Sequence, residues 1–227
     1  MKYFTAENLK QNFDSIDIDV SFECEEKTMT CIVGPSGSGK STVLRLISGL
    51  NKPCAEQKLI LDGKNINFLP PEKRGIGMVF QSHSLFNHLR VEDNVAYGLV
   101  SKGMKKKEAR KLAVEFLKSF ELEGFEKRWP ETLSGGEAQR VALARTLITK
   151  PKLVLFDEPL SALDAPLRKK LAALIKKLQK DFGFTGIMVT HDINEAKTVS
   201  DKIILMKNGK IFWDGKTDDF DETLLES

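Results

Sequence analysis

The sequence predicts an α/β fold with a parallel-sheet core, an antiparallel β subdomain and an inserted α-helical subdomain. Continuous apolar runs such as "LVLF" at residues 153–156 are typical of strands buried on both faces, as in a parallel sheet. Asp-Gly and Asn-Gly pairs each lie between two strand-like segments, which predicts antiparallel hairpins. Between residues 82 and 150 strand signals disappear and apolar residues recur at helical spacing. We therefore expect one domain over residues 1–227, with a core at 1–81 and 151–227 and helices at 82–150.

Composition limits the class of protein. Of the 227 residues 41% are hydrophobic and 30% are charged, values that suit a folded domain. Lys and Arg total 35 against 32 for Asp and Glu, a balance that by itself says little about partners. We expect no nucleic-acid partner. The cysteines Cys24, Cys31 and Cys54 form no C-x-x-C pair, which argues against a disulfide framework or a thiolate metal site. No run reaches the roughly 20 apolar residues of a membrane span, and no apolar signal segment opens the chain.

The N-terminal part alternates strands with a helix. Residues 16–24 show period-two alternation and residues 28–33 form an apolar run that ends at glycine, so both predict strands. A helix is predicted at 41–50, because apolar residues recur there at helical spacing. A hairpin with an Asp62-Gly63 turn is predicted at 59–66, and a further strand at 75–81.

The remaining elements are helices followed by a return to the α/β pattern. Two apolar series recur at helical spacing in the middle of the chain: Ala109, Leu112, Phe116 and Phe120, and then Val141, Ala144 and Ile148. Strands are predicted at 152–159 and 186–190, with a helix at 164–182 between them and a short helix after His191. The last hairpin, at 202–215, is predicted to turn at Asn208-Gly209.

A phosphate-binding loop is predicted between the strand at 28–33 and the helix at 41–50. Residues 34–41 match G-x-x-x-x-G-K-[ST] in the strand-to-helix context that the motif requires, which indicates a P-loop NTPase. The loop amides should cradle phosphates, with Lys40 at the terminal phosphates and the Ser41 hydroxyl as an Mg²⁺ ligand. The predicted ATP-binding residues here are Gly34, Pro35, Ser36, Gly37, Ser38, Gly39, Lys40, Ser41 and Thr42.

Two adjacent carboxylates, Asp157 and Glu158, follow the apolar strand at its carboxyl end, where α/β sheets bind ligands. Adjacent carboxylates at a strand end usually face solvent, and it is the P-loop upstream that favours a catalytic role. Asp157 is then expected to hold the Mg²⁺ shell. Glu158 is expected to orient or deprotonate the attacking water.

Further motifs, in a fixed order, make the chain resemble the nucleotide-binding ATPase subunits of ATP-binding cassette (ABC) transporters. They are "MVFQ" ending at Gln81, the signature "LSGGEAQR" at 133–140, the D-loop "SALD" at 161–164 and His191 in "VTHD". The resemblance covers nearly the whole chain and implies a RecA-like core with a β subdomain at 1–81 and 151–227. It points to importer-type members, and among them to short ones such as the thiamine importer ATPase.

The resemblance implies a role for each motif. Gln81 would sense Mg²⁺ and the attacking water while coupling to the membrane partner, and His191 would contact the γ-phosphate. The predicted catalytic residues are thus Glu158, His191 and Gln81, and the predicted metal ligands are Ser41, Gln81 and Asp157. Two subunits would pair head to tail, so that the signature of one covers the ATP of the other. The signature residues are Leu133, Ser134, Gly135, Gly136 and Glu137, and the D-loop residues are Ser161, Ala162, Leu163 and Asp164.

The start of the signature helix has two interpretations. The Ser134-Gly135-Gly136 sequence would present free amides at the positive end of a helix dipole, as in an anion site. Alternatively, Ser134 is an N-cap that forms a capping box with Glu137. Gln is the more common residue of the family at position 137, and a carboxylate aimed at ATP would repel it. We therefore expect Glu137 to turn back toward Ser134.

An aromatic side chain upstream of the P-loop would stack on adenine, as the resemblance implies. Phe13 is the candidate because it comes just before the first clear strand at 16–24. Tyr3 and Phe4 are the alternatives, and Phe13 as a core residue is another.

Two segments of the helical part suggest partners. Leu85, Phe86 and Leu89 follow the Gln81 loop and would be partly exposed, as in a groove that receives a helix of the permease, although core packing also explains them. The basic run at 102–111 is explained either as a solvated helix face or as a surface that approaches anionic lipid heads.

The expected function is the ATP-hydrolysing subunit of an ABC transporter that powers nutrient import. It implies ATP and Mg²⁺ as cofactors, a homodimer, permease subunits, a solute-binding protein and a peripheral place on the cytoplasmic face of the inner membrane. An exporter or a membrane-tethered regulatory complex would keep every motif. A P-loop kinase would leave "LSGGEAQR" and "SALD" unexplained.

Overall fold

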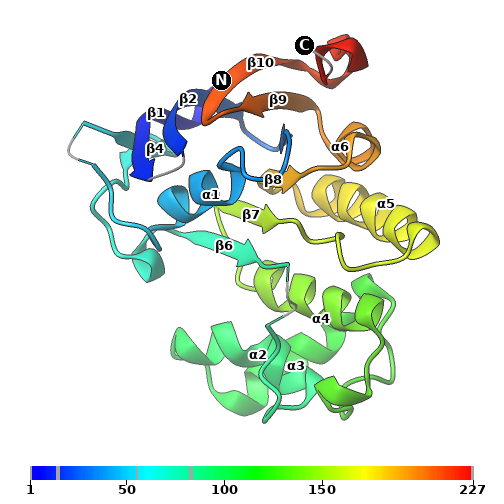
Figure 1. Ribbon diagram of the computed structural model, residues 1–227. Coiled ribbons are helices and arrows are strands. Elements are labelled where there is room, and N and C mark those ends of the chain that lie inside the picture. Colours follow the sequence, from blue (N-terminus) through cyan, green and yellow to red (C-terminus); the bar gives the residue numbers. More distant parts are fainter. Residues whose placement is uncertain (1, 14–15, 55, 82–83, 226–227) are drawn as a thin grey trace.

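The computed structural model describes residues 2–13, 16–54, 56–81 and 84–225, in which two sheets form. One is antiparallel, with the order β2-β1-β4-β5, and the other has the order β10-β9-β3-β8-β7-β6. In Figure 1 the larger sheet runs from β10 at the top down to β6 next to the helical lobe, and the antiparallel sheet lies at the upper left. The predicted α/β class with a parallel core and an antiparallel β subdomain is confirmed.

The larger sheet is parallel except at one edge. Its parallel strands are β6 (Ile76–Val79), β7 (Leu153–Asp157), β8 (Thr185–Thr190), β3 (Met29–Val33) and β9 (Lys202–Lys207). Every residue of β3 and β8 is buried, as expected for central strands covered on both faces. The edge strand β10 (Lys210–Lys216) returns antiparallel to β9 after the predicted Asn208-Gly209 turn, whose residues have φ of 47° and 76°.

The antiparallel sheet contains one strand that the sequence did not predict. This is β1 (Lys2–Phe13), which pairs with both β2 (Ile16–Glu25) and β4 (Lys58–Leu61); β4 continues into β5 (Lys64–Asn65). Its buried residues Phe4, Ala6 and Leu9 change spacing from two to three, because a bulge shifts the register between Ala6 and Leu9. The bulge interrupts the period-two pattern, which is why the sequence did not predict β1. The first strand therefore begins at Lys2, fourteen residues before the predicted start at Ile16 (16 − 2 = 14).

Helices cover both faces of the larger sheet. Helix α1 (Lys40–Ser48) lies between the two sheets, where its buried residues share one hydrophobic cluster with β1, β2, β4 and the inner face of the parallel strands. Helices α5 (Ala165–Phe182) and α6 (Ile193–Val199) pack on the opposite face. The short 3₁₀ turns of the described chain span Pro71–Lys73, Lys118–Phe120, Pro130–Thr132, Thr217–Asp219 and Glu222–Leu225.

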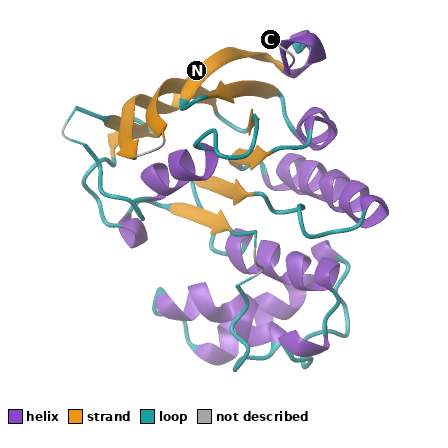
Figure 2. Cartoon of the chain, in the orientation of Figure 1, coloured by secondary structure: helices purple, strands orange, loops and turns teal. Residues whose placement is uncertain are grey.

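The helical lobe consists of α2 (Val91–Ser101), α3 (Lys106–Leu117) and α4 (Gly135–Leu147), drawn in purple at the bottom of Figure 2. The prediction for α3 was right about the helix and wrong about Leu112, which is 46% exposed. The buried residues of α3 are Ala109, Ala113 and Leu117, spaced by four. Two of them are alanines, which contribute little to a hydrophobicity pattern, so the larger Leu112 was wrongly placed on the buried face. The division at residues 82 and 150 stays a prediction.

Arg74 fastens the end of α1 to the segment that leads into β6. The residue is 3% exposed, and its guanidinium donates to the carbonyl oxygens of Leu46 (2.9 Å) and Ile47 (2.7 Å) in the last turn of α1. It also donates to those of Asn67 and Leu69, both at 2.8 Å. Burial lowers the pKa of Arg74. A cation at a helix C-terminus is favoured by the helix dipole and satisfies carbonyls that have no partner in the helix.

Candidate nucleotide-binding site

The predicted site residues meet at one edge of the parallel sheet. Strand β8 lies between β3 and β7, and all three run in the same direction. Their carboxyl ends therefore deliver the P-loop, the Asp157-Glu158 pair and His191 to neighbouring positions. No helix in the described part of the chain has the length and apolarity needed to cross a membrane.

The P-loop has the backbone conformation that its glycines permit. Gly34, Gly37 and Gly39 have φ of 151°, 81° and 96°. A side chain at Gly34 would overlap the carbonyl oxygen of Met206 on β9, and one at Gly39 would overlap Ile18 of β2. Gly34 and Gly39 are therefore required by the close approach of neighbouring strands as well as by their φ values, and Gly37 by its φ value alone.

Lys40, the first residue of α1, folds back across the loop. Its ammonium donates to the carbonyl oxygens of Gly34 and Pro35, each at 2.8 Å, and the residue is 5% exposed. Burial lowers the pKa of Lys40, while the nearby Glu158 and Asp157 raise it. The ammonium thus lies inside the loop, where it can transfer its hydrogen bonds to phosphate oxygens.

Ser41 and Asp157 are brought together as predicted. The Ser41 hydroxyl donates to Asp157 Oδ1 at 2.7 Å, linking the start of α1 to the end of β7. A hydroxyl and a carboxylate are the hard oxygen ligands that Mg²⁺ accepts alongside waters and phosphate oxygens. The donor set therefore fits Mg²⁺, which Ser41 and Asp157 would hold and which would neutralise charge on the β- and γ-phosphates.

Glu158 and His191 form the second pair of the site. The Glu158 residue has φ of 44°, uncommon for a residue other than glycine, and its amide donates to the Val189 carbonyl at 3.1 Å. Its Oε2 lies 3.2 Å from His191 Nδ1. The His191 side chain is 52% exposed and that of Glu158 is 22% exposed, so the pair is open to a water and to a ligand from solution.

The D-loop follows this pair directly. The Ser161 amide and hydroxyl both bond to the Glu158 carbonyl, at 3.3 and 3.0 Å, and Leu163 is buried. Asp164 caps α5 by accepting from the Leu167 amide at 2.9 Å. The backbone of the D-loop is therefore tied to the residue that would handle the attacking water.

Gln81 is the predicted site residue that the structure does not join to the others. It is exposed in the loop after β6, which neighbours β7 at the same sheet edge. The contacts of the described residues include none between Gln81 and Asp157 or Glu158. Its role as a metal ligand and catalytic residue stays a prediction.

The signature helix α4 begins with the expected capping box. The Ser134 hydroxyl accepts from the Glu137 amide at 3.4 Å, and Glu137 Oε2 accepts from the Ser134 amide (2.7 Å) and hydroxyl (2.9 Å). These bonds lower the pKa of Glu137. Gly136 packs on the side chain of Leu167 in α5, where a Cβ would come within 2.8 Å of it. The two interpretations of the sequence are thus compatible, because the Glu137 carboxylate turns back onto Ser134 and leaves Gly135 exposed.

Comparison with known proteins identifies the family. A family model described as ABC transporter matches residues 18–161, a span that contains the P-loop, the signature and the Asp157-Glu158 pair. The chain belongs to the ABC transporter family.

Relatives and solved structures of the family cover most of the chain. An Fe(3+) ions import ATP-binding protein, FbpC 1, of Rhizobium meliloti is 47% identical over 90% of the chain and 58% of its own length. An FbpC of Agrobacterium fabrum is 47% identical over 92% of the chain and 60% of its own length. The chain thus spans less than two thirds of these relatives, which are named for Fe(3+) and not for thiamine.

Two solved structures are similar over 96% of the chain. A dimeric post-hydrolysis state of the ATP-binding cassette MJ0796 bound to ADP and Pi is 36% identical with a TM-score of 0.80, and all of that chain is covered. The cbiO1 of Clostridium perfringens, part of the ABC transporter complex cbiONQ, is 29% identical with a TM-score of 0.86 over 90% of that chain. These likenesses confirm the predicted P-loop NTPase fold.

The aromatic candidates of this ABC domain divide clearly. Phe13 is the last residue of β1, and its side chain lies outside the described part of the structure. Phe4 is completely buried against Phe22, so it cannot stack on a nucleotide base. Tyr3 lines a different groove, beside Phe182 and Lys152. Phe13 therefore stays the candidate by prediction.

The segment after Gln81 in this ABC domain is held by a residue that the sequence reasoning missed. Leu85, Phe86 and Leu89 are partly exposed, as expected for a docking surface. Asn94, fully buried in the first turn of α2, accepts from the Phe86 amide at 2.9 Å and donates to the Phe86 and Leu89 carbonyls at 3.1 and 2.9 Å. The sequence signal for this role was an asparagine in the first turn of a helix, where its side chain can bond to nearby backbone groups.

Proposed function

We propose that the chain is the ATP-hydrolysing subunit of an ABC importer, working as a homodimer on the cytoplasmic face of the cell membrane. The observation that carries the proposal is the meeting of five residues at one sheet edge. Ser41 contacts Asp157 at 2.7 Å and Glu158 contacts His191 at 3.2 Å, with Lys40 inside the P-loop that adjoins them.

Each group has a task in phosphoryl transfer to water. The P-loop amides and Lys40 bind the β- and γ-phosphates, and Ser41 and Asp157 hold Mg²⁺. Glu158 orients the attacking water or takes a proton from it, while His191 donates to the γ-phosphate and fixes the Glu158 carboxylate. Gln81 senses the metal and the water from the loop after β6.

A second copy of the chain completes the site. The exposed Ser134 and the glycine amides at the start of α4 would bind the γ-phosphate held by the P-loop of the partner copy. The similarity to a cassette solved as a dimer with ADP and Pi supports this arrangement. ATP binding then closes the dimer, and hydrolysis reopens it.

The import direction and the partners rest on the relatives. Proteins named for Fe(3+) import are about half identical to the chain, so we propose ferric iron as the first cargo to test, with a permease and a solute-binding protein as partners. The partly exposed Leu85, Phe86 and Leu89 would receive the permease.

A Glu158→Gln variant tests the proposed function. It should keep ATP binding, lose about 100-fold or more in turnover and run as a dimer on size exclusion when ATP and Mg²⁺ are present. The matched control is Glu123→Gln, which changes an exposed glutamate that forms no hydrogen bond or ion pair within the described residues. This control should behave as wild type. A Glu158→Gln protein that hydrolyses ATP normally, or that stays monomeric at saturating ATP, would contradict the proposal.

A further inference from the structure

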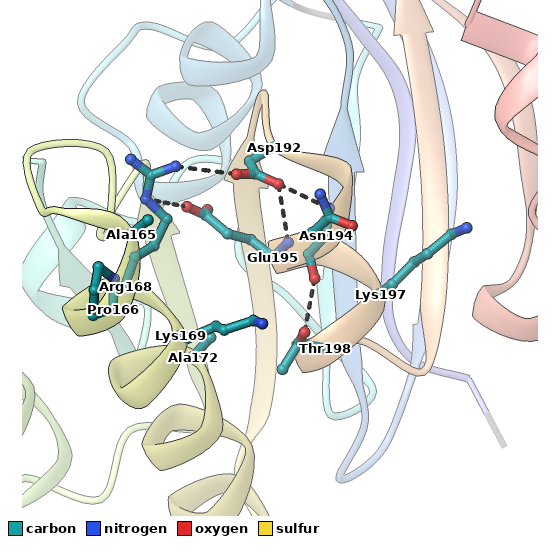
Figure 3. Close-up of a pocket in the computed structure, with 10 residues that line it drawn as sticks. All are labelled: Ala165, Pro166, Arg168, Lys169, Ala172, Asp192, Asn194, Glu195, Lys197 and Thr198. Atoms are coloured by element: carbon teal, nitrogen blue, oxygen red, sulfur yellow. Dashed lines mark hydrogen bonds and ion pairs between the residues drawn. The ribbon is translucent and has the colours of Figure 1, made fainter.

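A groove of about 740 Å³ separates the first turns of α5 from α6, beside the D-loop and His191. Figure 3 shows that the guanidinium of Arg168 points across this groove toward Asp192 and Glu195. None of these three residues was identified from the sequence. Together they join two motifs of the proposed ATPase site that are distant in sequence.

Arg168 connects three groups at once. Its Nη2 donates to the Leu163 carbonyl of the D-loop at 3.0 Å, and its Nη1 donates to Asp192 Oδ2 at 3.1 Å. Its Nε lies 3.4 Å from Glu195 Oε1, a distance for an ion pair without a well-formed hydrogen bond. A planar guanidinium with several donors can hold such a set of acceptors in fixed relative positions, and a lysine cannot.

Glu195 holds Thr190, the residue that precedes His191. The carboxylate is 6% exposed and its Oε2 accepts from the Thr190 hydroxyl at 2.7 Å. The Thr190 hydroxyl in turn accepts from the Asp192 amide at 3.1 Å. Burial raises the pKa of Glu195, which means that its charge depends on compensation by neighbours such as Arg168.

His191 is therefore held through the residues on both sides of it. Thr190 is bonded to Glu195, and Asp192 is bonded to Arg168. Asp192 also caps α6 through its other oxygen, Oδ1, which accepts from the Asn194 amide at 2.8 Å. The imidazole itself contacts Glu158, whose carbonyl accepts the bonds from Ser161 of the D-loop.

We propose that Arg168 is a positioning residue that sets His191 relative to the D-loop, so that a displacement of the D-loop by the second subunit moves His191 toward its working position. The inference rests on the proposed function, since it assigns His191 to the γ-phosphate. Arg168 does not touch the nucleotide in this scheme. It acts through the backbone of Leu163 and the side chain of Asp192.

Steady-state kinetics on the full chain give the first test. Arg168→Ala should lower kcat by about tenfold or more and leave the KM for ATP within about twofold, because the P-loop is unchanged and a small misplacement of a catalytic group is costly. Arg168→Lys should recover only part of kcat. The matched control Lys169→Ala removes the neighbouring exposed cation of the same groove and should leave both constants unchanged. A kcat of Arg168→Ala within twofold of wild type would overturn the proposal.

A double variant separates positioning from general destabilisation. In a His191→Ala background, Arg168→Ala should cause no further loss beyond about twofold, since the group that it positions is gone. An equal additional loss in that background would show that Arg168 acts elsewhere and would overturn the proposal. Asp192→Asn, which keeps the Oδ1 cap of α6, should lower kcat in the same direction as Arg168→Ala.

Histidine NMR tests the link without catalysis. The chain has three histidines, so ring-labelled protein gives three imidazole signals, and His191→Asn identifies the one of interest. Without nucleotide, Arg168→Ala should shift the His191 signal alone, and Lys169→Ala should shift none. An unmoved His191 signal in Arg168→Ala refutes the link. Absence of ATPase activity in wild type would instead refute the proposed function, because this measurement needs no turnover.

Discussion

The Glu137 side chain stabilises the start of α4 and at the same time leaves room for an anion there. Its carboxylate bonds to the Ser134 amide and hydroxyl, so it lies over the N-terminus of α4 instead of facing outward from it. The negative charge is placed where the helix dipole favours it. The free amides of the following glycines remain available for an anion.

Replacing Glu137 by alanine should lower the free energy of unfolding by about 1 kcal/mol at pH 7, because half of the capping box is lost. The sign with pH follows from the lowered pKa of Glu137. Its contribution is present above the ordinary glutamate pKa of about 4.3 and is lost as pH falls through the lower value of the folded state.

Denaturant unfolding at pH 7 and at pH 3 measures this difference. The gap between Glu137→Ala and wild type should narrow at the lower pH, whereas the exposed control Glu123→Ala should match wild type at both. A gap that widens in acid would contradict the assignment of the carboxylate to the cap.

At the residue scale, spacing and strand context in the sequence locate the P-loop, the Asp157-Glu158 pair and the Ser134 cap, whereas His191 comes from the family resemblance. The structure confirms the cap, and the roles of the site residues stay predictions. Arg168 and Glu195 could not be found that way, because each acts through residues that only the packing of α5 against α6 brings near. For Gln81 the described part of the chain shows no contact with Asp157 or Glu158, so its role stays a prediction.

At the scale of elements, α1 depends on a cation from a distant segment. Arg74 satisfies carbonyls in the last turn of α1 and in the segment before β6, and Gly49 makes room for it, since a Cβ there would lie 2.6 Å from Arg74 Nε. The P-loop helix and the strand that leads to Gln81 are thereby fixed to each other. This connection explains how α1 can end in the interior without orphaned carbonyls.

Replacing Arg74 by alanine should lower the free energy of unfolding by about 3 kcal/mol, because several buried carbonyls would lose their donor. Arg74→Lys should recover less than half of this, since an ammonium cannot reach carbonyls on both sides. Chemical denaturation gives the comparison, with the exposed Lys73→Ala as the matched control. An Arg74→Ala protein as stable as Lys73→Ala would contradict this account.

The elements themselves were predicted where periodicity was regular. The strands of the parallel sheet and the hairpins follow from apolar runs and turn residues, whereas β1 was missed because a bulge beside Asn8, with φ of 52°, interrupts its alternation. The helix α3 was predicted with the wrong buried residue, because Ala113 contributes to packing and little to a hydrophobicity pattern. Irregular backbone and small residues are the features that local patterns convey least.

At the scale of the whole molecule, the proposed homodimer divides each site between two copies. The P-loop and the start of α4 belong to different lobes in Figure 1, and the Ser134 face is exposed. Ser134→Arg should therefore leave ATP binding to a single chain nearly intact and abolish hydrolysis, because an arginine would obstruct the partner's γ-phosphate. Weakened binding by the monomer would contradict this expectation.

Mixing two inactive variants tests the division directly. Lys40→Ala and Ser134→Arg should each be inactive alone, but a mixed dimer has one site in which both the P-loop and the signature are intact. Random pairing makes half of the dimers mixed, so the mixture should show about one quarter of wild-type turnover if each intact site works alone. Lys40→Ala mixed with Lys40→Ala/Ser134→Arg is the matched control and should stay inactive. If both mixtures were equally inactive in ATP hydrolysis, the result would argue against shared sites.

The contact between Gly34 and Met206 has a consequence for the order of events in the cell. The first turn of the P-loop rests on a carbonyl of β9, and the Gly209 amide donates to the Ser38 carbonyl at 3.3 Å, so the loop near the start of the chain is shaped by its last hairpin. A ribosome must release the chain through Gly209 before this cradle can form. A nascent chain that stops before β9 and Gly209 therefore lacks the contacts that shape the P-loop.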